Sequence, residues 1–124
     1  MSDDTALLAH LTRALGPLPP TMAALCQQAQ PTMLAKGAAL LREGVRWQHL
    51  WWLEHGALRL YYLDRNGQAA SKNFYLDGAM IWPITPILRE QPVHFWVEAL
   101  EASRTWSLPW DAWSATTEGF APWQ

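Results

Sequence analysis

The sequence has few charged side chains, a single cysteine and no long apolar run. Charged residues make up 16% of the 124 positions, whereas an average globular domain has about a quarter. Cys26 has no partner for an internal disulfide and cannot supply a multi-cysteine metal or iron–sulfur site. A single thiol fits a reducing cytoplasm better than a secreted disulfide scaffold.

The sequence also gives no sign of a membrane span, a secretion signal or a nucleic-acid-binding surface. No stretch reaches the roughly 18 consecutive apolar residues of a spanning helix, and the acidic start Met1-Ser2-Asp3-Asp4 lacks the basic region of a signal peptide. The 9 basic and 11 acidic side chains give a net charge of −2, without the basic excess of a nucleic-acid binder. We therefore expect a cytoplasmic protein that contacts neither membrane nor nucleic acid directly.

Tryptophan is abundant, with nine residues. At this length, folding buries roughly two thirds of the surface of the unfolded chain, which is enough for a single core. Large aromatic side chains are rarely enclosed completely. Nine of them in so small a domain predict an apolar surface that a neighbouring domain or a second copy covers.

Two short helices are predicted at the N-terminus. The first has leucines at helical spacing behind a cap at Ser2 or an adjacent aspartate, and Gly16-Pro17 ends it. The second runs from Met22 to Gln28 behind a cap at Thr21, and Pro31 closes it.

Beyond Pro31 the pattern predicts strands, because glycines 37, 44, 56, 67 and 78 lie 7 to 12 residues apart. Residues 49–53, 57–63 and 68–76 are expected to form consecutive antiparallel strands, with a hairpin at Asn66-Gly67. Alternation along the middle strand predicts a core face and an opposite face. The core face would be Leu58, Leu60 and Tyr62, and the opposite face Ala57, Arg59 and Tyr61.

The C-terminal third is expected to hold another strand pair and a helix. The pair would be residues 95–100 and 104–108, and the helix would run from Trp110 to Thr117 with Pro109 and Asp111 at its start. Trp110 and Trp113 are three residues apart on this helix and would present one stripe to a dimer partner.

Short motifs follow one another in a fixed order along most of the chain. They are Lys36-Gly37, Arg42-Glu43-Gly44, the run from Leu50 to Tyr62, Asn66-Gly67, Asn73-Phe74, Gly78, the run from Val97 to Leu100 and the run from Trp106 to Trp113. Their joint order resembles the cyclic-nucleotide-binding domain of Crp/Fnr-type bacterial transcription regulators. The resemblance implies a mainly β fold, an antiparallel β-roll or jelly roll (double-stranded β-helix) with short flanking α-helices. The domain plan would be N-terminal helices at 1–30, the roll at 31–109 and the start of a truncated C-terminal helix at 110–124.

In that family a phosphate cassette, Gly-Glu-Leu followed after about eight residues by Arg-Ser/Thr-Ala, binds the cyclic nucleotide. Alignment without gaps between Gly78 and Ala99 places Trp82-Pro83-Ile84 on the first triplet and Val93-His94-Phe95 on the second. A proline has no N–H to donate, and valine cannot neutralise a phosphate. The resemblance therefore implies a degenerate cassette that does not bind cyclic nucleotides, with Arg89 as the one nearby cation able to substitute.

The aromatic and histidine residues near this segment have two interpretations. Trp82, Phe95 and Trp96 would either line a site for a small apolar or aromatic ligand or plug the roll. The other tryptophans are expected to be packing or interface residues, and because strand neighbours point to opposite faces, one of Trp51 and Trp52 would face a flanking helix. No metal-binding spacing supports the histidines as ligands, and no cofactor is expected. Cys26 is predicted to be a buried small apolar residue.

The function implied by the resemblance is a ligand-sensing, regulatory domain of a Crp/Fnr-like transcription regulator, and not an enzyme. Such a protein would be a homo-oligomer or would lack its C-terminal DNA-binding domain here. Two alternatives stay open. One is a stand-alone protein-interaction domain with a plugged pocket and an exposed tryptophan surface. The other is a small cupin-like enzyme, which requires clustered His, Glu or Asp inside the barrel.

Overall fold

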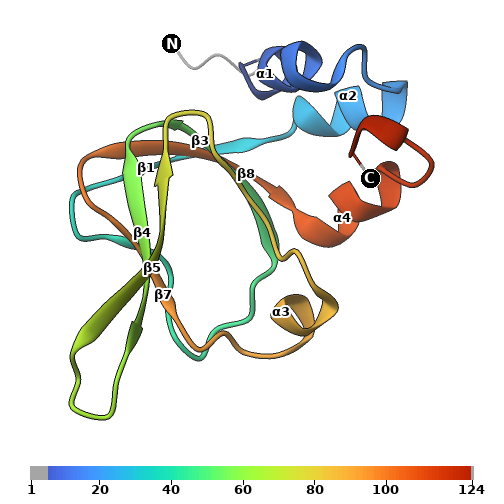
Figure 1. Cartoon of the computed structure of the whole chain (residues 1–124). Helices are drawn as coiled ribbons and strands as arrows, with labels where there is room; N and C mark the ends of the chain where they lie inside the picture. The colour runs from blue at the N-terminus through green and yellow to red at the C-terminus, as the bar shows by residue number, and fades with distance from the viewer. Residues whose placement is uncertain (1–5, 124) are drawn as a thin grey trace.

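Eight strands form two antiparallel sheets in the computed structural model, which describes residues 6–123 (Figure 1). The strands are β1 (Gln30–Leu34), β2 (Ala39–Leu41), β3 (His49–His55), β4 (Ala57–Leu63), β5 (Ala69–Leu76), β6 (Met80–Ile81), β7 (Trp96–Ala99) and β8 (Ser103–Pro109). One four-stranded sheet has the order β1-β8-β3-β6, and the other has the order β2-β7-β4-β5. The prediction of a mainly β, antiparallel roll is confirmed.

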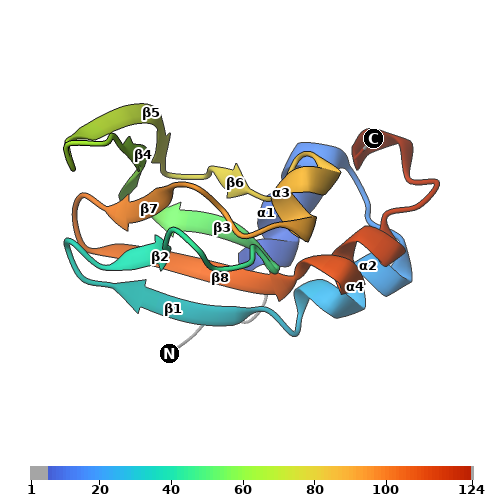
Figure 2. The same cartoon turned by 90° about the horizontal axis from the view of Figure 1, so that it is seen from below.

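Helices flank the roll at one end. They are α1 (Ala6–Leu15), α2 (Pro20–Cys26), α3 (Pro86–Glu90), α4 (Trp110–Thr116) and the 3-10 turn η1 (Ala121–Trp123). The two views show α2 and α4 beside each other beyond the end of β8 (Figures 1 and 2). Figure 1 shows α1 next to α2, and α3 apart from both. Thr21 as a cap is wrong. Pro19 occupies that position, because Pro20 with its fixed φ begins the helix. The cap predicted at Ser2 lies outside the described residues.

Strand β3 separates two hydrophobic cores. Its four central residues, 50–53, are all buried. Trp51 and Leu53 face the interior of the roll, whereas Leu50 and Trp52 face the helices. Alternation therefore gives this strand an apolar side chain on each face. The prediction that one of the two adjacent tryptophans faces a flanking helix is confirmed for Trp52.

The expected pairing of 49–53 with 57–63 is wrong, because β3 and β4 lie in different sheets. The chain changes sheet at Gly56, whose φ of +133° is open to glycine. A Cβ there would lie 2.1 Å from Ser103 Oγ and 2.7 Å from Ser103 Cα. The glycine therefore lets the corner of the roll pass directly against β8.

The expected pairing of 95–100 with 104–108 is also wrong. Strand β7 pairs with β2 and β4, and β8 pairs with β1 and β3. The connection at 100–102 contains no two-residue turn signal of the Asn-Gly kind, so nothing in it folds the two strands back on each other. The hairpin at Asn66-Gly67 is confirmed, since β4 and β5 pair on either side of it.

Candidate functional site

Two hollows open on the side of the roll between strand β4 and helix α3. The large hollow has a volume of about 340 Å³, and the small hollow has a volume of about 210 Å³. Tyr62, Leu88 and Phe95 line both. The large hollow is otherwise lined chiefly by Trp47, Leu60, Asn73, Tyr75, Ile81 and Trp82. The small hollow is completed by Ile87, Gln91, Pro92, Val93 and His94.

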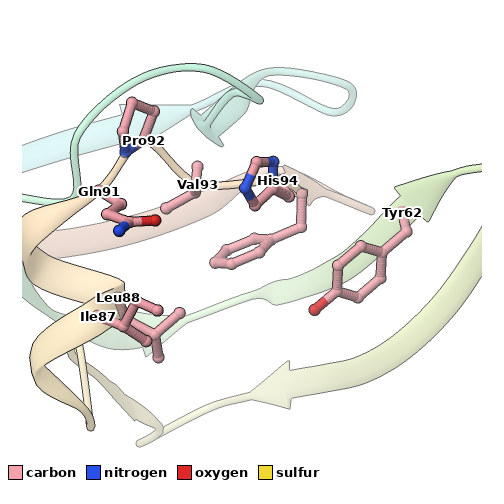
Figure 3. Close-up of a pocket in the computed structure, with 8 residues that line it drawn as sticks. Tyr62, Ile87, Leu88, Gln91, Pro92, Val93 and His94 are labelled. Carbon is pink, nitrogen blue, oxygen red and sulfur yellow. The ribbon is translucent and has the colours of Figure 1, made fainter.

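The small hollow lies between α3, the segment that follows it and the phenol of Tyr62. Figure 3 shows Tyr62 reaching from β4 with its hydroxyl directed towards Ile87 and Leu88, while Gln91 projects its amide from the end of α3. Proline starts this five-residue helix at Pro86, because its fixed φ suits the first helical position. Pro92 then follows shortly after its end, where a proline cannot continue a helix.

Backbone hydrogen bonds hold the segment after α3 against the turn between β2 and β3. The N–H of Gly44 donates to the carbonyl of Val93 at 2.8 Å, and the N–H of Val93 donates to the carbonyl of Val45 at 2.9 Å. Arg46 donates from Nη1 to the carbonyl of Glu90. The floor of the small hollow is therefore fixed at both ends.

Phe95 is the fixed part of the wall between the hollows. Its ring is buried and makes edge contacts with two other rings, Trp47 at 5.9 Å and Tyr62 at 5.8 Å between centroids. Such edge-to-face pairs are favourable beyond the area they bury. Phe95 thus occupies part of the roll interior without filling the space on either side.

The residues expected to replace the phosphate cassette do not form one cluster. Trp82 lines the large hollow and contacts Trp123 at 5.1 Å, and Val93 is buried below the small hollow. Pro83 is buried, with one side on a separate depression near Trp110. Ile84 is 72% exposed at the rim of the large hollow, and His94 is exposed beside the small one.

Arg89 does not point into either hollow. Its Nη2 donates to Asp111 Oδ2 at 2.8 Å, and its Nε donates to Asp111 Oδ1 at 3.1 Å. This two-point ion pair joins α3 to α4. The hydrogen bonds with Arg89 lower the pKa of the Asp111 carboxyl, and those with Asp111 raise the pKa of the guanidinium. Both groups are therefore charged at neutral pH.

The hollows carry no formal charge in their walls, since no Lys, Arg, Asp or Glu of residues 6–123 lines either of them. Apart from the indoles, the polar side chains are Asn73 and Tyr75 in the large hollow, Gln91 and His94 in the small one, and Tyr62 in both. Burial raises the pKa of the Tyr75 phenol, so this group stays a neutral hydrogen-bonding hydroxyl. The site suits an apolar ring better than an ion.

Several lining residues were missed by sequence reasoning. The core-face prediction is wrong for Tyr62, which is 37% exposed, whereas Tyr61 is buried. The register of β4 with β5 shifts between Leu60 and Tyr61, so alternation does not continue to the end of the strand. Tyr62 lines both hollows instead.

Leu88 lies on the short helix that Pro86 begins, and a proline at the start of a helix is the one local signal for this residue. Trp47 carries no local signal, because it reaches the large hollow from the turn between β2 and β3. Asn73 belongs to a motif of the family resemblance but was not assigned to the site, and Gln91 reaches the small hollow from the end of α3.

The tryptophan predictions need three corrections. Trp96 lies on the outer face of the roll, stacked on Tyr61 with ring centroids 6.4 Å apart, because β7 turns Val97 and Ala99 inward instead. Trp113 is fully buried against the helices and the outer face of β3 and β8, and so does not face a dimer partner. The expected exposed tryptophan surface is wrong: five of the nine indoles are buried and the other four are half-buried.

The remaining chemistry-bearing groups lie away from the hollows or stand alone. Cys26 is fully buried, as predicted, and burial raises the pKa of its thiol to about 11. Burial also lowers the pKa of His49. Within the described part of the chain, His, Cys, Asp and Glu do not group into a metal-binding cluster. None of the helices there has the length and apolarity needed to cross a membrane.

Comparison with known proteins identifies the architecture around these hollows. The family model described as "Cyclic nucleotide-binding domain" matches residues 31–118. None of the curated protein sequences is a significant match. Among solved structures, the sensor domain of the transcriptional regulator DNR from Pseudomonas aeruginosa has a TM-score of 0.76 at 20% identity, covering 95% of this chain and 79% of that one.

Two further solved structures share the fold. The Catabolite Activator Protein of Thermus thermophilus has a TM-score of 0.69 at 18% identity, covering 91% of this chain and 52% of that one. The regulatory subunit of a cAMP-independent protein kinase A from Trypanosoma cruzi, bound to guanosine, has a TM-score of 0.76 at 15% identity, covering 94% and 42%. The chain thus spans about half the length of these two proteins, or less.

Proposed function

The chain belongs to the cyclic nucleotide-binding domain family, and on this basis we propose that it is the ligand-sensing domain of a Crp/Fnr-like transcription regulator that does not respond to cyclic nucleotides. Its ligand is a small apolar or aromatic molecule bound in the roll, and the domain is cytoplasmic and regulatory, not enzymatic. The observation that carries the proposal is the uncharged lining of both hollows at the place where the family resemblance puts the nucleotide site.

A cyclic nucleotide brings a phosphate anion that this lining cannot neutralise. Val93 offers no cation at the expected arginine position, and its N–H already donates to the carbonyl of Val45. Pro83, at the expected glutamate position, has neither a carboxylate nor an N–H. A hydrogen bond to a charged group contributes about 1.5–3 kcal/mol, and about 4 kcal/mol separates micromolar from millimolar binding. Loss of two or three such contacts therefore accounts for the loss of useful affinity. Arg89 is already occupied by Asp111.

One of the solved structures supports the idea that this fold takes ligands without a phosphate. The Trypanosoma cruzi regulatory subunit is described as cAMP-independent and bound to guanosine, a nucleoside that carries no phosphate. We take from this structure only that a domain of this fold can bind a ligand without a cyclic phosphate.

The switch would run from the hollows to the C-terminal helix. Leu88 lines both hollows, and Arg89, its neighbour on α3, pairs with Asp111 on α4. A ligand that displaces α3 would therefore bias the position of α4. In an intact regulator that displacement would be transmitted to a dimerisation helix and a DNA-binding module, as a population shift between two states.

A stand-alone protein-interaction domain is the second candidate, favoured by apolar side chains on the outer face of the roll. Phe74 and Leu76 on the edge strand β5 are 57% and 65% exposed. The open hollows weigh against the plugged pocket that this alternative assumes.

Isothermal titration calorimetry with cyclic AMP and cyclic GMP tests the proposal. The wild-type domain and an Arg89→Ala variant are both expected to give no binding heat at micromolar ligand concentrations. Micromolar binding by the wild type would contradict the proposal. If the wild type bound and Arg89→Ala did not, Arg89 would be identified as the substituting cation. If both bound, the phosphate would lie at another position.

A further inference from the structure

The hollows adjoin each other across three shared side chains, Tyr62, Leu88 and Phe95. Ligand pockets in proteins generally occupy about 300–1,000 Å³. The small hollow falls below this range and the large hollow lies near its lower limit. A molecule that fills both would occupy a pocket of ordinary size.

The wall between the hollows has one fixed and two adjustable members. Phe95 is buried and packs edge-to-face against Trp47, which is buried as well. Leu88 is only half-buried on a five-residue helix, and Tyr62 is exposed near the end of β4. Side-chain rotation of Leu88 and Tyr62 is therefore the least costly way to join the two spaces.

The chemistry of the lining selects against ions of either sign. Its polar groups are neutral hydroxyl and amide groups and one exposed imidazole. An anion or a cation that entered would lose water without gaining an opposite charge. Aromatic rings from Trp47, Tyr75 and Trp82 line the large hollow, so a planar apolar group gains the most contact there.

The rim supports an apolar occupant as well. Ile84 stands 72% exposed at the large hollow, and Ile87 stands 61% exposed at the small one. Exposed apolar side chains gathered at the mouth of a cavity are typical of a binding site.

We propose that the two hollows are one binding site for an uncharged, elongated, mainly aromatic molecule, and that Leu88 is the residue that sets its specificity. The aromatic part lies in the large hollow, and the molecule extends past Leu88 towards Gln91. This deepens the proposed sensing function by naming the charge and shape of its ligand.

A matched pair of fluorescent probes tests this proposal. N-phenyl-1-naphthylamine is an uncharged aromatic molecule, and 1-anilinonaphthalene-8-sulfonate has the same ring system with one added negative charge. Both are titrated against the wild-type domain. We expect the neutral probe to bind at micromolar concentration and the sulfonate to bind at least tenfold more weakly.

Leu88→Lys places a cation in the shared wall and is expected to reverse this preference, weakening the neutral probe at least tenfold and strengthening the sulfonate. Met33→Lys is the control, because Met33 is an apolar residue 66% exposed on β1, outside both hollows. It is expected to leave the preference of the wild type unchanged. Thermal unfolding tests whether each variant folds. If Leu88→Lys does not fold, Leu88→Gln replaces it, because this substitution removes apolar contact without adding charge. Leu88→Gln is expected to weaken the neutral probe at least tenfold.

Four results would overturn the proposal. They are no binding of the neutral probe, equal binding of both probes by the wild type, a folded Leu88 variant that keeps the wild-type affinities, or Met33→Lys changing the preference as much as Leu88→Lys. These results leave the sensing function standing as long as cyclic AMP and cyclic GMP fail to bind. Micromolar binding of a cyclic nucleotide refutes the sensing function whatever the two probes do.

Discussion

Replacement of Gly56 by alanine tests whether the corner between β3 and β4 depends on close approach to β8. The added Cβ would lie 2.1 Å from Ser103 Oγ and 2.7 Å from Ser103 Cα, so the backbone of β8 has to move. The φ of +133° adds strain, which for a residue other than glycine costs about 1–3 kcal/mol. Ser103 is buried and cannot turn away freely.

Movement of Ser103 also disturbs two hydrogen bonds. Its Oγ accepts from the N–H of Ala57 at 3.2 Å and donates to the carbonyl of Glu101 at 2.9 Å. Each such bond contributes about 1 kcal/mol. We therefore expect Gly56→Ala to lower the free energy of unfolding by about 4 kcal/mol, from strain and lost bonds together. This is a large part of the roughly 5–15 kcal/mol of a typical domain.

Gly67→Ala is the matched control, because Gly67 also has a positive φ, +78°, but nothing lies within 4 Å of its Cβ position. Backbone strain alone predicts a cost of about 1–2 kcal/mol there. Urea unfolding followed by circular dichroism measures both variants. If Gly56→Ala were no more destabilising than Gly67→Ala, the contact with Ser103 would not constrain the fold and the reasoning would be refuted.

Two further predictions concern the helical end of the domain. Trp106→Phe should destabilise the fold by about 2 kcal/mol more than Trp113→Phe, since Trp106 Nε1 donates to Glu54 at 2.5 Å, whereas Trp113 Nε1 has no acceptor among residues 6–123. Urea unfolding measures this difference, and equal losses would show that the bond to Glu54 adds nothing. The second prediction concerns the stability of the domain in acid. Hydrogen bonds from Arg89 lower the pKa of the Asp111 carboxyl below its ordinary 3.8. The ion pair therefore stabilises the folded state above pH 3.8, and this contribution is lost as the pH falls through the lowered pKa of Asp111. Unfolding free energies measured from pH 7 to pH 2 should therefore fall less steeply with acid in Asp111→Asn than in the wild type, and parallel curves would contradict this role.

The sequence was most informative where turn chemistry and alternation act locally. Asn66-Gly67 predicted the hairpin correctly, and alternation placed Leu58 in the core. Pairing between strands that are not joined by a tight turn was not predictable in this way. Residues 49–53 and 57–63 look like a second hairpin, yet Gly56 sends them into different sheets. A local pattern specifies which residues are strands, whereas the partner of each strand depends on how both sheets curve.

The site was predictable only in part for the same reason. The segment from Trp82 to Phe95 was named from its place in the family resemblance, and five of the seven residues named there line one of the two hollows. The other two, Pro83 and Arg89, lie on the separate depression near Trp110. Trp47 enters the large hollow from a turn that is distant in sequence. The pairing of Arg89 with Asp111 joins residues 22 positions apart, and no spacing rule relates two short helices in different parts of a chain.

The division of apolar side chains by β3 has a consequence for how such a domain can change during evolution. Neighbours such as Trp51 and Trp52 belong to separate cores, so a substitution of one of them removes side-chain contacts from only one of the two cores. Leu88 and Tyr62, the half-buried and exposed members of the wall between the hollows, lie outside both sets of fully buried residues. Substitutions at the mouth of the roll therefore alter the proposed ligand site without changing the fully buried side chains beneath the helices.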